Sequence, residues 1–434
     1  MAKSSDFQKL RSSHFLPRWL PLLALAGAGC SQQPAVAPPA ATPPASVSPS
    51  PASTEPSEEA LERLRSLGYL DTSGLPKLGA GKGVKLLDRK LVSPGYTLVV
   101  FAGTCTAQLL TLEGEIVRSW KAEPCHRWEH AELLPEGDLV VVGSRLDDTA
   151  DQDPKNTGRY IMRLSWSGEV VWRLEINAHH DVCLASDGTL VTLVRSNRRI
   201  PAIDPDNDLA DDSITFLSPA GKVLKSVSLY DVLSSSRIPF TIQKAGAPEG
   251  GKGLIDLFHS NSIRSASVPE LEGRSPIYGR DAVIVTSRHQ DELMIIDLRS
   301  RQLLWRWGRG VLSGPHEATI LPNGNILVFD NGLSRGWSRV LELNPLAPDK
   351  LIQFAPGPSR LFSRVMGACQ RMPNGNTLIV HSEGGAAFEL TAQGTPAWIY
   401  EGTQQTSDGH RVKLIRMRRL PTAMVEDILS RRGT

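Results

Sequence analysis

One pattern recurs six times along the sequence and constrains the fold more than any other feature. It consists of a strand with alternating apolar residues, a polar turn that usually contains glycine, and a second strand that often ends near tryptophan. The six copies begin at Ala107, Tyr160, Ile214, Leu293, Val340 and Ala386. Strand-rich units that repeat about every 50 residues without helical periodicity are typical of a β-propeller. We therefore predict an all-β, six-bladed β-propeller.

A second unit lies between the hairpins and supports the same fold. It is a turn with glycine followed by a short apolar strand, as in LLPEGDLVVV, LASDGTLVTL, ILPNGNILVF and RMPNGNTLIV, with a looser copy in YGRDAVIVTSR. The propeller domain is expected over residues 96–434. The strand YTLVVFAG near 96–103 is expected to close the ring by pairing with the C-terminal hairpin, because closure removes exposed strand edges.

Two further expectations concern single segments of the propeller. The basic cluster RMRR at 416–419 is expected to be a solvated segment. Tryptophans recur at hairpin ends and are expected to pack between blades; they are Trp172, Trp305, Trp307 and Trp398.

The N-terminus has the features of an export signal. Basic residues precede the apolar run LPLLALAGAG, and Cys30 follows small residues, so residues 1–29 are predicted to be a lipoprotein-type signal peptide with lipid attached to Cys30. Gly27 stands where such signals usually have leucine, so secretion with cleavage nearby remains the alternative. These features predict a periplasmic or cell-envelope protein anchored by lipid to a membrane, the outer membrane where the cell has one.

Two segments separate the signal from the propeller. Residues 30–57 are predicted to be a disordered Pro/Ala-rich linker, since residues 31–56 contain eight prolines and few apolar residues. Residues 58–95 are predicted to hold a short helix and the lead-in to the first blade.

Charge and cysteine content exclude some functions. The net charge is only +2 and no basic stripe is interleaved with aromatic residues, so nucleic-acid binding is not expected. Beyond Cys30 there are four cysteines, none in a CxxC pair, so no metal site is predicted. Pairing of Cys105 with Cys125 is open from the sequence.

The repeat brings polar residues of different blades to equivalent positions. Counting back eight residues from the turn glycine gives Glu129, His180, His316 and, in another blade, Gly367. A residue at this offset is expected near the central channel of the ring. Because glycine fills the same place in one blade, the histidines are not needed there for folding.

The blade between the second and third of these positions offers two more candidates. His259 precedes the strand DAVIVTS, and Arg288 follows it directly. A guanidinium group among histidines suggests an anion site, because its planar fork can hold two oxygens of a sulfate or phosphate. His289 is expected to point away and to be structural, and His126 and His130 are ambiguous.

Four blocks of sequence together resemble the bacterial arylsulfate sulfotransferases. They are HSNSI, SRHQ, PHEATILPNGNILVFDNG and HHDVCLASDG, and the resemblance spans roughly residues 97–400. It implies a six-bladed propeller exported to the periplasm. It also implies an enzyme that moves a sulfuryl group from an aryl sulfate to a phenol without a nucleotide donor.

The resemblance implies roles for particular residues. His316 corresponds to a nucleophile that becomes a sulfohistidine, Arg288 to the arginine on the sulfuryl oxygens, and His259 to a histidine beside the same group. His180 corresponds to a further histidine of the pocket, with His179 as the fallback. No metal or organic cofactor is implied.

Three other residues are candidates for substrate binding. They are Asn261, Asn331 and Glu129. Asn331 also fits the alternative of a left-handed turn residue, since it lies in the turn signal DNG.

Two rival functions stay open. One is a non-catalytic, lipid-anchored propeller that serves as a binding scaffold, because fold does not fix function. The other is a sulfatase that uses the same pocket. The sequence shows no counterpart of the separate N-terminal β-domain that the resemblance implies, so the oligomeric state, and the physiological donor and acceptor, are left open.

Overall fold

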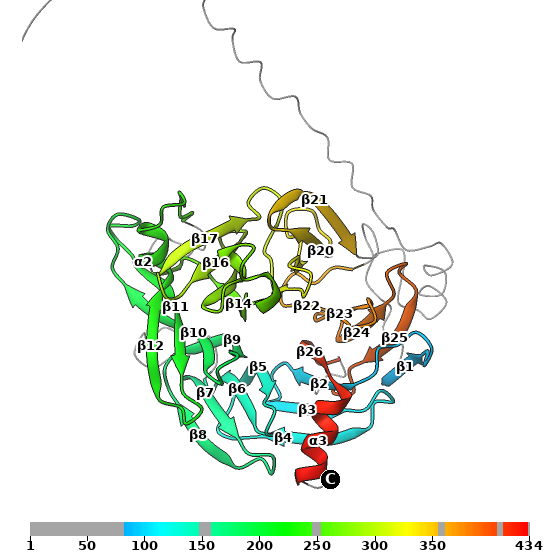
Figure 1. The fold of residues 1–434 in the computed structure, drawn as a ribbon. Helices are drawn as coiled ribbons and strands as arrows, with labels where there is room; N and C mark the ends of the chain where they lie inside the picture. The colour runs from blue at the N-terminus through cyan, green and yellow to red at the C-terminus, as the bar shows by residue number, and fades with distance from the viewer. Residues whose placement is uncertain (1–81, 147–157, 245–252, 355–360, 406–410, 433–434) are drawn as a thin grey trace, which may run out of the picture. The chain divides into compact units, whose positions relative to one another are not determined.

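Six antiparallel sheets arranged around a common axis make up the described part of the chain (Figure 1). The computed structural model describes residues 82–146, 158–244, 253–354, 361–405 and 411–432. The predicted signal peptide, Cys30, the linker and the short helix lie outside these residues. The all-β, six-bladed prediction is confirmed. No helix among the described residues has the length and apolar character that a membrane span requires.

Each sheet is a blade of four strands, named here from the axis outward. Blade 1 contains β26 (Leu414–Leu420), β2 (Tyr96–Phe101), β3 (Thr106–Leu110) and β4 (Ile116–Lys121). Blade 2 contains β5 (Arg127–Leu133), β6 (Leu139–Ser144), β7 (Arg159–Leu164) and β8 (Val170–Leu174). Blade 3 contains β9 (Ala178–Leu184), β10 (Leu190–Arg198), β11 (Asp208–Leu217) and β12 (Val223–Ser228), with β13 (Leu254–Asp256) parallel to β11.

The other three blades follow the same order. Blade 4 contains β14 (Ser260–Ser265), β15 (Ala282–Ser287), β16 (Glu292–Asp297) and β17 (Gln302–Trp307). Blade 5 contains β18 (Ala318–Ile320), β19 (Ile326–Asp330), β20 (Arg339–Asn344) and β21 (Ala347–Phe354). Blade 6 contains β22 (Ala368–Arg371), β23 (Thr377–His381), β24 (Ala386–Leu390) and β25 (Pro396–Glu401), and gains a fifth strand, β1 (Gly83–Leu87), from the lead-in.

The second strand of each blade explains the short apolar runs in the sequence. Every residue of β6, β15 and β19 is buried. These strands are covered on both faces by the neighbouring blades, so they are apolar throughout instead of alternating. The packing of adjacent blades forms the hydrophobic core.

The ring closes differently from the expectation. The strand from Tyr96 does not join the hairpin that begins at Ala386; β2 pairs with β26, which becomes the innermost strand of blade 1. The RMRR cluster is therefore not a solvated segment, because Arg416 and Arg419 are buried within β26. Closure still joins the N-terminal strand to the end of the chain.

The four predicted tryptophans pack between neighbouring blades, and three of them also form a hydrogen bond to the next blade. Trp172 donates to the Pro219 carbonyl, Trp305 to that of Pro345, and Trp398 to that of Leu112, which joins blade 6 to blade 1. Trp120 makes the same kind of bond to Ser165, and Trp307 packs against the core of blades 4 and 5 without such a bond in the described residues. These bonds recur because each outer hairpin lies beside the turn of the next blade.

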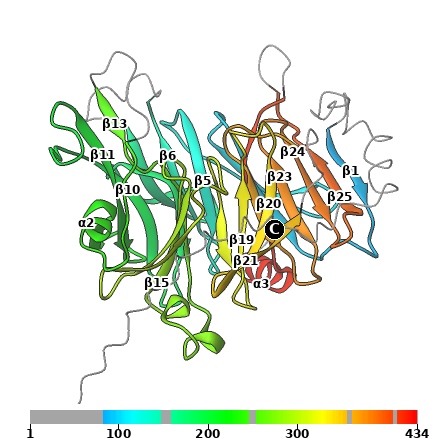
Figure 2. The ribbon, with the colours of Figure 1, turned by 90° about the horizontal axis from the view of Figure 1, so that it is seen from above.

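The described residues contain few helices. The contacts of α3 (Thr422–Arg432) and one disulfide stabilise the N-terminal blades. Helix α2 (Leu229–Ser234) lies between blades 3 and 4, and η2 (Pro269–Leu271) and η3 (Pro276–Tyr278) lie between β14 and β15 of blade 4. Helix α3 ends the described chain. Helix α3 buries Ile428 against the β5–β6 turn, and Arg431 donates to the Pro135 carbonyl there. Figure 2 shows α3, in red, at the C-terminal end of the chain. Cys105 and Cys125 form a disulfide, which settles the pairing that the sequence left open.

Candidate active site

A cavity of about 460 Å³ lies on the ring axis, at the end where the innermost strands begin. It brings together the four predicted catalytic residues from three blades, His180, His259, Arg288 and His316. The predicted substrate-binding residues Asn261 and Glu129 also line it. The remaining wall is formed by Arg127, Arg159, Arg195, Val365, Met366, Gly367, Ile415 and Arg416.

Irregular strand pairing turns these side chains toward the axis. Glu129 in β5, Asn261 in β14 and Ile415 in β26 are each an extra residue opposite the second strand. In β9 the register shifts at His180, whose φ of 59° is unusual for a residue other than glycine. Bulges of this kind redirect side chains and are frequent beside active sites. The offset found in the sequence therefore marks the bulged end of the inner strands.

His316 is held on both ring nitrogens. Its Nδ1 lies 2.6 Å from Asn331 Oδ1, and its Nε2 accepts the backbone N–H of Met366 at 3.0 Å. Asn331 Oδ1 can only accept, because its Nδ2 donates to the Ser363 and Met366 carbonyls. The proton of the imidazole therefore lies on Nδ1, and Nε2 carries the lone pair. Burial, with the charge of Arg288, lowers the pKa of His316 to about 3, so the ring is neutral.

Asn331 lies behind His316 and is fully buried. It is not the left-handed turn residue of the alternative interpretation, since the positive φ in DNG belongs to Gly332, at 71°. Asn261 acts in a similar way, because its Nδ2 donates to the Pro315 carbonyl at 2.9 Å, next to His316. Both amides thus fix the segment that carries this histidine.

Arg288 forms no ion pair among the described residues. Its Nη1 contacts His289 Nε2 at 3.1 Å, and His289 Nδ1 donates to the Asp256 carbonyl at 2.7 Å. His289 therefore does not point away from the site, as the sequence suggested, but holds Arg288. Neighbouring side chains on an extended chain diverge, but β15 ends at Ser287 and residues 288–291 form a turn, in which Asp291 has a φ of 53°. The guanidinium remains available for an anion in the cavity.

His259 is oriented by a carboxylate. Its Nδ1 lies 2.7 Å from Asp256 Oδ2, and its backbone N–H donates to Oδ1 of the same residue. Arg195 donates to Asp256 Oδ2 as well, at 2.9 Å. Burial opposes ionisation of Asp256, but Arg195 and His259 together hold its pKa well below the usual value. His259 Nε2 has no partner among the described residues.

His180 is oriented from two sides. Its backbone N–H donates to Glu129 Oε2 at 2.6 Å, and its Nδ1 lies 2.7 Å from His179 Nδ1. Arg127 and Arg159 donate to the other oxygen of Glu129. Burial lowers the pKa of His180 well below its usual value, although the Glu129 charge opposes this. The ring centroids of His180 and His259 are 4.9 Å apart, so the two imidazoles share one side of the cavity.

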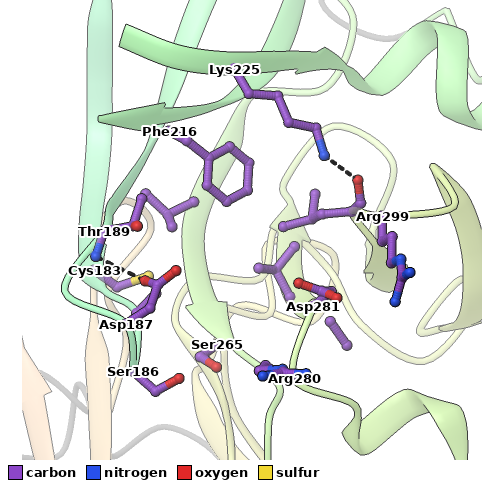
Figure 3. A pocket seen from close by; sticks show the side chains of 15 residues that line it. Cys183, Ser186, Asp187, Thr189, Phe216, Lys225, Ser265, Arg280, Asp281 and Arg299 are labelled. Atoms are coloured by element: carbon purple, nitrogen blue, oxygen red, sulfur yellow. Dashed lines mark hydrogen bonds between the residues drawn. The ribbon is translucent and has the colours of Figure 1, made fainter. Parts of the chain in front are cut away.

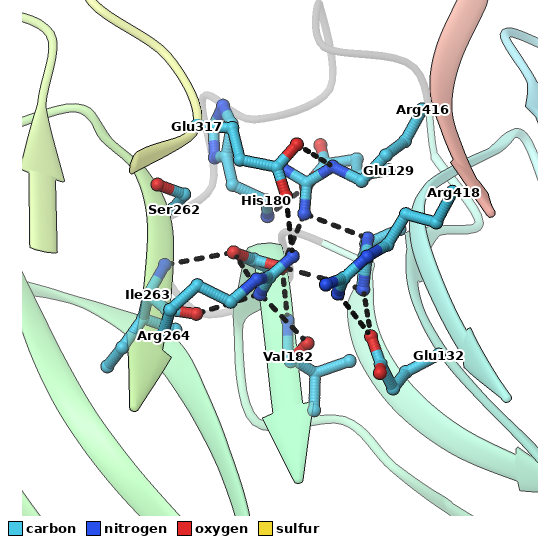
Figure 4. Close-up of polar contacts among 12 residues, drawn as sticks. Glu129, Glu132, His180, Val182, Ser262, Ile263, Arg264, Glu317, Arg416 and Arg418 are labelled. Carbon is cyan, nitrogen blue, oxygen red and sulfur yellow. Dashed lines mark hydrogen bonds and ion pairs between the residues drawn. The ribbon is translucent and has the colours of Figure 1, made fainter. Parts of the chain in front are cut away.

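A buried ion network forms the floor beneath these residues (Figure 4). At its centre Asp181 accepts from Arg416 of blade 1 and Arg264 of blade 4, at 2.7 and 2.6 Å. His130, one of the ambiguous histidines, contacts Arg416 here at 3.0 Å, whereas His126 is exposed. The network fixes Asp181 and hence the adjacent His180. Sequence patterns gave no signal for it, because every partner comes from a different blade.

One group of the site has the spacing of metal ligands. Donor atoms of Asp256, His259 and His289 lie within 4.8 Å of one another. These donors already bind each other, and Arg195 and Arg288 bring two positive charges to the same atoms. The set therefore fits a hydrogen-bonded relay better than a cation, because guanidinium groups repel a metal ion.

A second cavity, of about 470 Å³, lies between blades 3 and 4 (Figure 3). It is lined by the turn at Ser186 and Asp187 and by the exposed side chains of Arg280 and Arg299. None of the residues predicted to act in catalysis or binding lines it. It is separate from the histidine cluster.

One protein-family profile matches the chain over most of the propeller. The family profile described as Arylsulfotransferase (ASST) matches residues 157–403, which contain all four predicted catalytic residues. A search of curated proteins found no match.

Solved structures with a similar chain fold include a protein of unknown function from Bacteroides caccae. It is 14% identical, with a TM-score of 0.46, over 75% of this chain and 100% of that one. Another is virginiamycin B lyase from Staphylococcus aureus, 10% identical, with a TM-score of 0.41, over 74% of this chain and 88% of that one.

Proposed function

The chain belongs to the arylsulfotransferase family, and we propose on that premise that it moves a sulfuryl group from an aryl sulfate to a phenol through a sulfated His316, without a nucleotide donor. The setting of His316 supports this most directly. Asn331 keeps the proton on Nδ1, so the lone pair of Nε2 lies at the wall of the cavity that Arg288 also lines. A neutral imidazole beside an unpaired guanidinium suits attack on an anionic group.

The first half-reaction forms a bond between His316 Nε2 and the sulfur of the donor. The bond from sulfur to the aryl oxygen breaks, and its electron pair leaves with the oxygen, which takes a proton from His259 or His180. Arg288 holds the sulfuryl oxygens, whose charge is spread as in phosphoryl transfer, so positioning and positive charge dominate catalysis. For the attack, Nε2 must leave the N–H of Met366, which it accepts at 3.0 Å.

The second half-reaction reverses the first with a new phenol. The phenol gives its proton to a neutral histidine, its oxygen attacks sulfur, and the electron pair of the broken S–N bond returns to Nε2. Apolar surface for the aryl ring is available beside His316, from Val365, Met366 and Ile415.

The test is a transfer assay with the purified protein. Incubated with 4-nitrophenyl sulfate and a free phenol, the wild type is expected to release nitrophenol in a phenol-dependent manner. Mass spectrometry should find one labile sulfuryl group on His316. His316→Asn should lose at least about 100-fold in rate, while His126→Asn, at an exposed histidine, should not change it.

The outcomes separate the rival functions. Turnover by His316→Asn at the wild-type rate would reject His316 as the nucleophile. Release of free sulfate with no dependence on the phenol would indicate a sulfatase. No turnover with a range of aryl sulfates would favour the binding scaffold.

We also propose that the protein is exported to the cell envelope and anchored through lipid on Cys30, as the N-terminal sequence suggests. The Cys105–Cys125 disulfide supports export, because such bonds persist in oxidising compartments. Fractionation of cells and labelling with a radioactive fatty acid test this. A Cys30→Ala variant that still takes up label would reject the anchor.

A further inference from the structure

Behind His180, and away from the cavity, a second histidine and a carboxylate continue the line of contacts. His179 Nδ1 lies 2.7 Å from His180 Nδ1, and His179 Nε2 lies 3.0 Å from Asp212 Oδ1. His179 and Asp212 are both 0% exposed. Only His180, at the end of the line, reaches the cavity.

The facing atoms of His179 and Asp212 are buried in the protein. Among the described residues neither His179 Nε2 nor Asp212 Oδ1 has a hydrogen bond of regular geometry, and their contact at 3.0 Å is an ion-pair distance. Arg195 Nε lies 3.8 Å from the same oxygen. The second oxygen of Asp212 accepts the backbone N–H of Ser260 at 2.8 Å. Burial disfavours the charge of Asp212, but His179 and Arg195 hold its pKa below the usual value, so it is a carboxylate.

The charge of Asp212 determines which ring nitrogens of His179 and His180 carry protons. A carboxylate only accepts, so His179 carries its proton on Nε2 and has a lone pair on Nδ1. His180 must then donate from Nδ1, which leaves a lone pair on its Nε2. That nitrogen has no partner among the described residues and belongs to a ring that lines the cavity.

We propose that His179 and Asp212 form a buried proton relay behind His180, which makes His180 the group that protonates the departing aryl oxygen and takes the proton of the incoming phenol. This rests on the proposed function and decides between the two histidines there. His179 and Asp212 are positioning residues, since neither touches substrate.

The relay accounts for the proton that the phenol releases in the second half-reaction. The phenol O–H proton moves to His180 Nε2 while the phenol oxygen attacks sulfur and the S–N bond of His316 breaks. The Nδ1 proton of His180 can then pass to His179 Nδ1, and Asp212 offsets the resulting positive charge. His259 differs because it contacts its carboxylate directly and is 28% exposed, so no second histidine lies between its ring and the charge.

The experiment separates the two half-reactions. Single-turnover sulfation is measured with 4-nitrophenyl sulfate, whose leaving group needs no proton. Discharge of sulfated His316 is then measured with substituted phenols whose pKa values run from about 7 to about 10. The variants are Asp212→Asn and His179→Gln. Asp211→Asn is the matched control, because Asp211 is equally buried but contacts Arg198 and Ser228 on the other side of the strand.

Loss of the relay should slow discharge about 100-fold with the least acidic phenol and only about 3-fold with the most acidic one. Sulfation should keep its wild-type rate, and the control should match the wild type in both steps. An equal loss with every phenol, or slower sulfation, would overturn the relay. No sulfation of the wild type would instead reject the proposed function.

A measurement on the wild type tests the relay even if the variants do not fold. Nitrogen-15 NMR of labelled histidine should show His180 protonated on Nδ1, with its proton shared with His179. A proton on His180 Nε2 in the neutral ring would refute the relay.

Discussion

At the scale of single residues, the site depends on groups that position its histidines and the segments that carry them. Asn331, Asn261 and Glu129 are predicted from the sequence to bind substrate, and the structure places their hydrogen bonds on His316, Pro315 and His180. The partners come from other blades in two of the three cases. The repeat offset identifies Glu129 as axial, but it cannot tell which neighbour this residue meets.

Asn331 gives the sharpest prediction at this scale. Asn331→Ala removes the acceptor for His316 Nδ1 and the donor to the carbonyls of Ser363 and Met366. The imidazole then loses its fixed tautomer, so we expect the sulfation rate to fall about 100-fold with little change in donor affinity. Stopped-flow release of nitrophenol measures both.

Asn323→Ala is the control for this variant, because Asn323 is exposed in the β18–β19 turn of the same blade. Wild-type sulfation by Asn331→Ala would mean that the tautomer of His316 is set by another contact, such as the Gly314 carbonyl at 3.2 Å.

At the scale of elements, the indole bonds between blades contribute to ring stability. Trp398 is fully buried and donates to the Leu112 carbonyl at 2.8 Å, across the junction where blade 6 meets blade 1. Trp398→Phe keeps an aromatic ring but leaves that carbonyl without its donor. We expect the free energy of unfolding to fall by about 1–3 kcal/mol, measured by urea denaturation.

Trp307→Phe is a suitable comparison, since Trp307 makes no indole hydrogen bond among the described residues. It removes the same atoms from a half-buried ring and so reports the loss of packing at such a position. If both variants lose equal stability, the bond across the junction contributes nothing.

The elements also show which features of the fold can be predicted from the sequence. All six hairpins are predicted from strand alternation and turn glycines, because those signals are local. The pairing of β2 with β26 is not predicted, because the sequence of β26, LIRMRRL, resembles a solvated segment. Arg416 is tolerated on an innermost strand only because Asp181 and Glu317, from other blades, supply negative charge. Distant pairing of this kind leaves no local pattern.

At the scale of the whole molecule, buried titratable groups make the fold sensitive to acid. Burial lowers the pKa of His316 to about 3, and it lowers that of His130, His180 and His381 as well. The unfolded chain, with histidine pKa values near 6.5, therefore binds protons that the folded protein does not. Stability should fall as the pH drops below about 6.5, with each histidine contributing up to about 1.4 kcal/mol per pH unit.

A second stage follows at lower pH. Burial opposes ionisation of Asp181 and Glu317, but arginines hold both pKa values below the usual range, so their stabilising contribution is present above about pH 4.5 and is lost below it. Thermal unfolding between pH 8 and pH 4 should show a constant midpoint above about pH 7 and a decline below it. A constant midpoint down to pH 5 would show that the histidines titrate alike in both states.

Closure through β26 has a consequence for biosynthesis. Ile415 and Arg416 line the cavity from the last strand of the propeller, which is also the inner strand of its first blade. A nascent chain that still lacks these residues has five complete blades and an open seam, so its cavity is missing a wall and part of its floor. We therefore expect the cavity to be complete only after residues 414–420 have left the ribosome, and a chain truncated before them to lack activity.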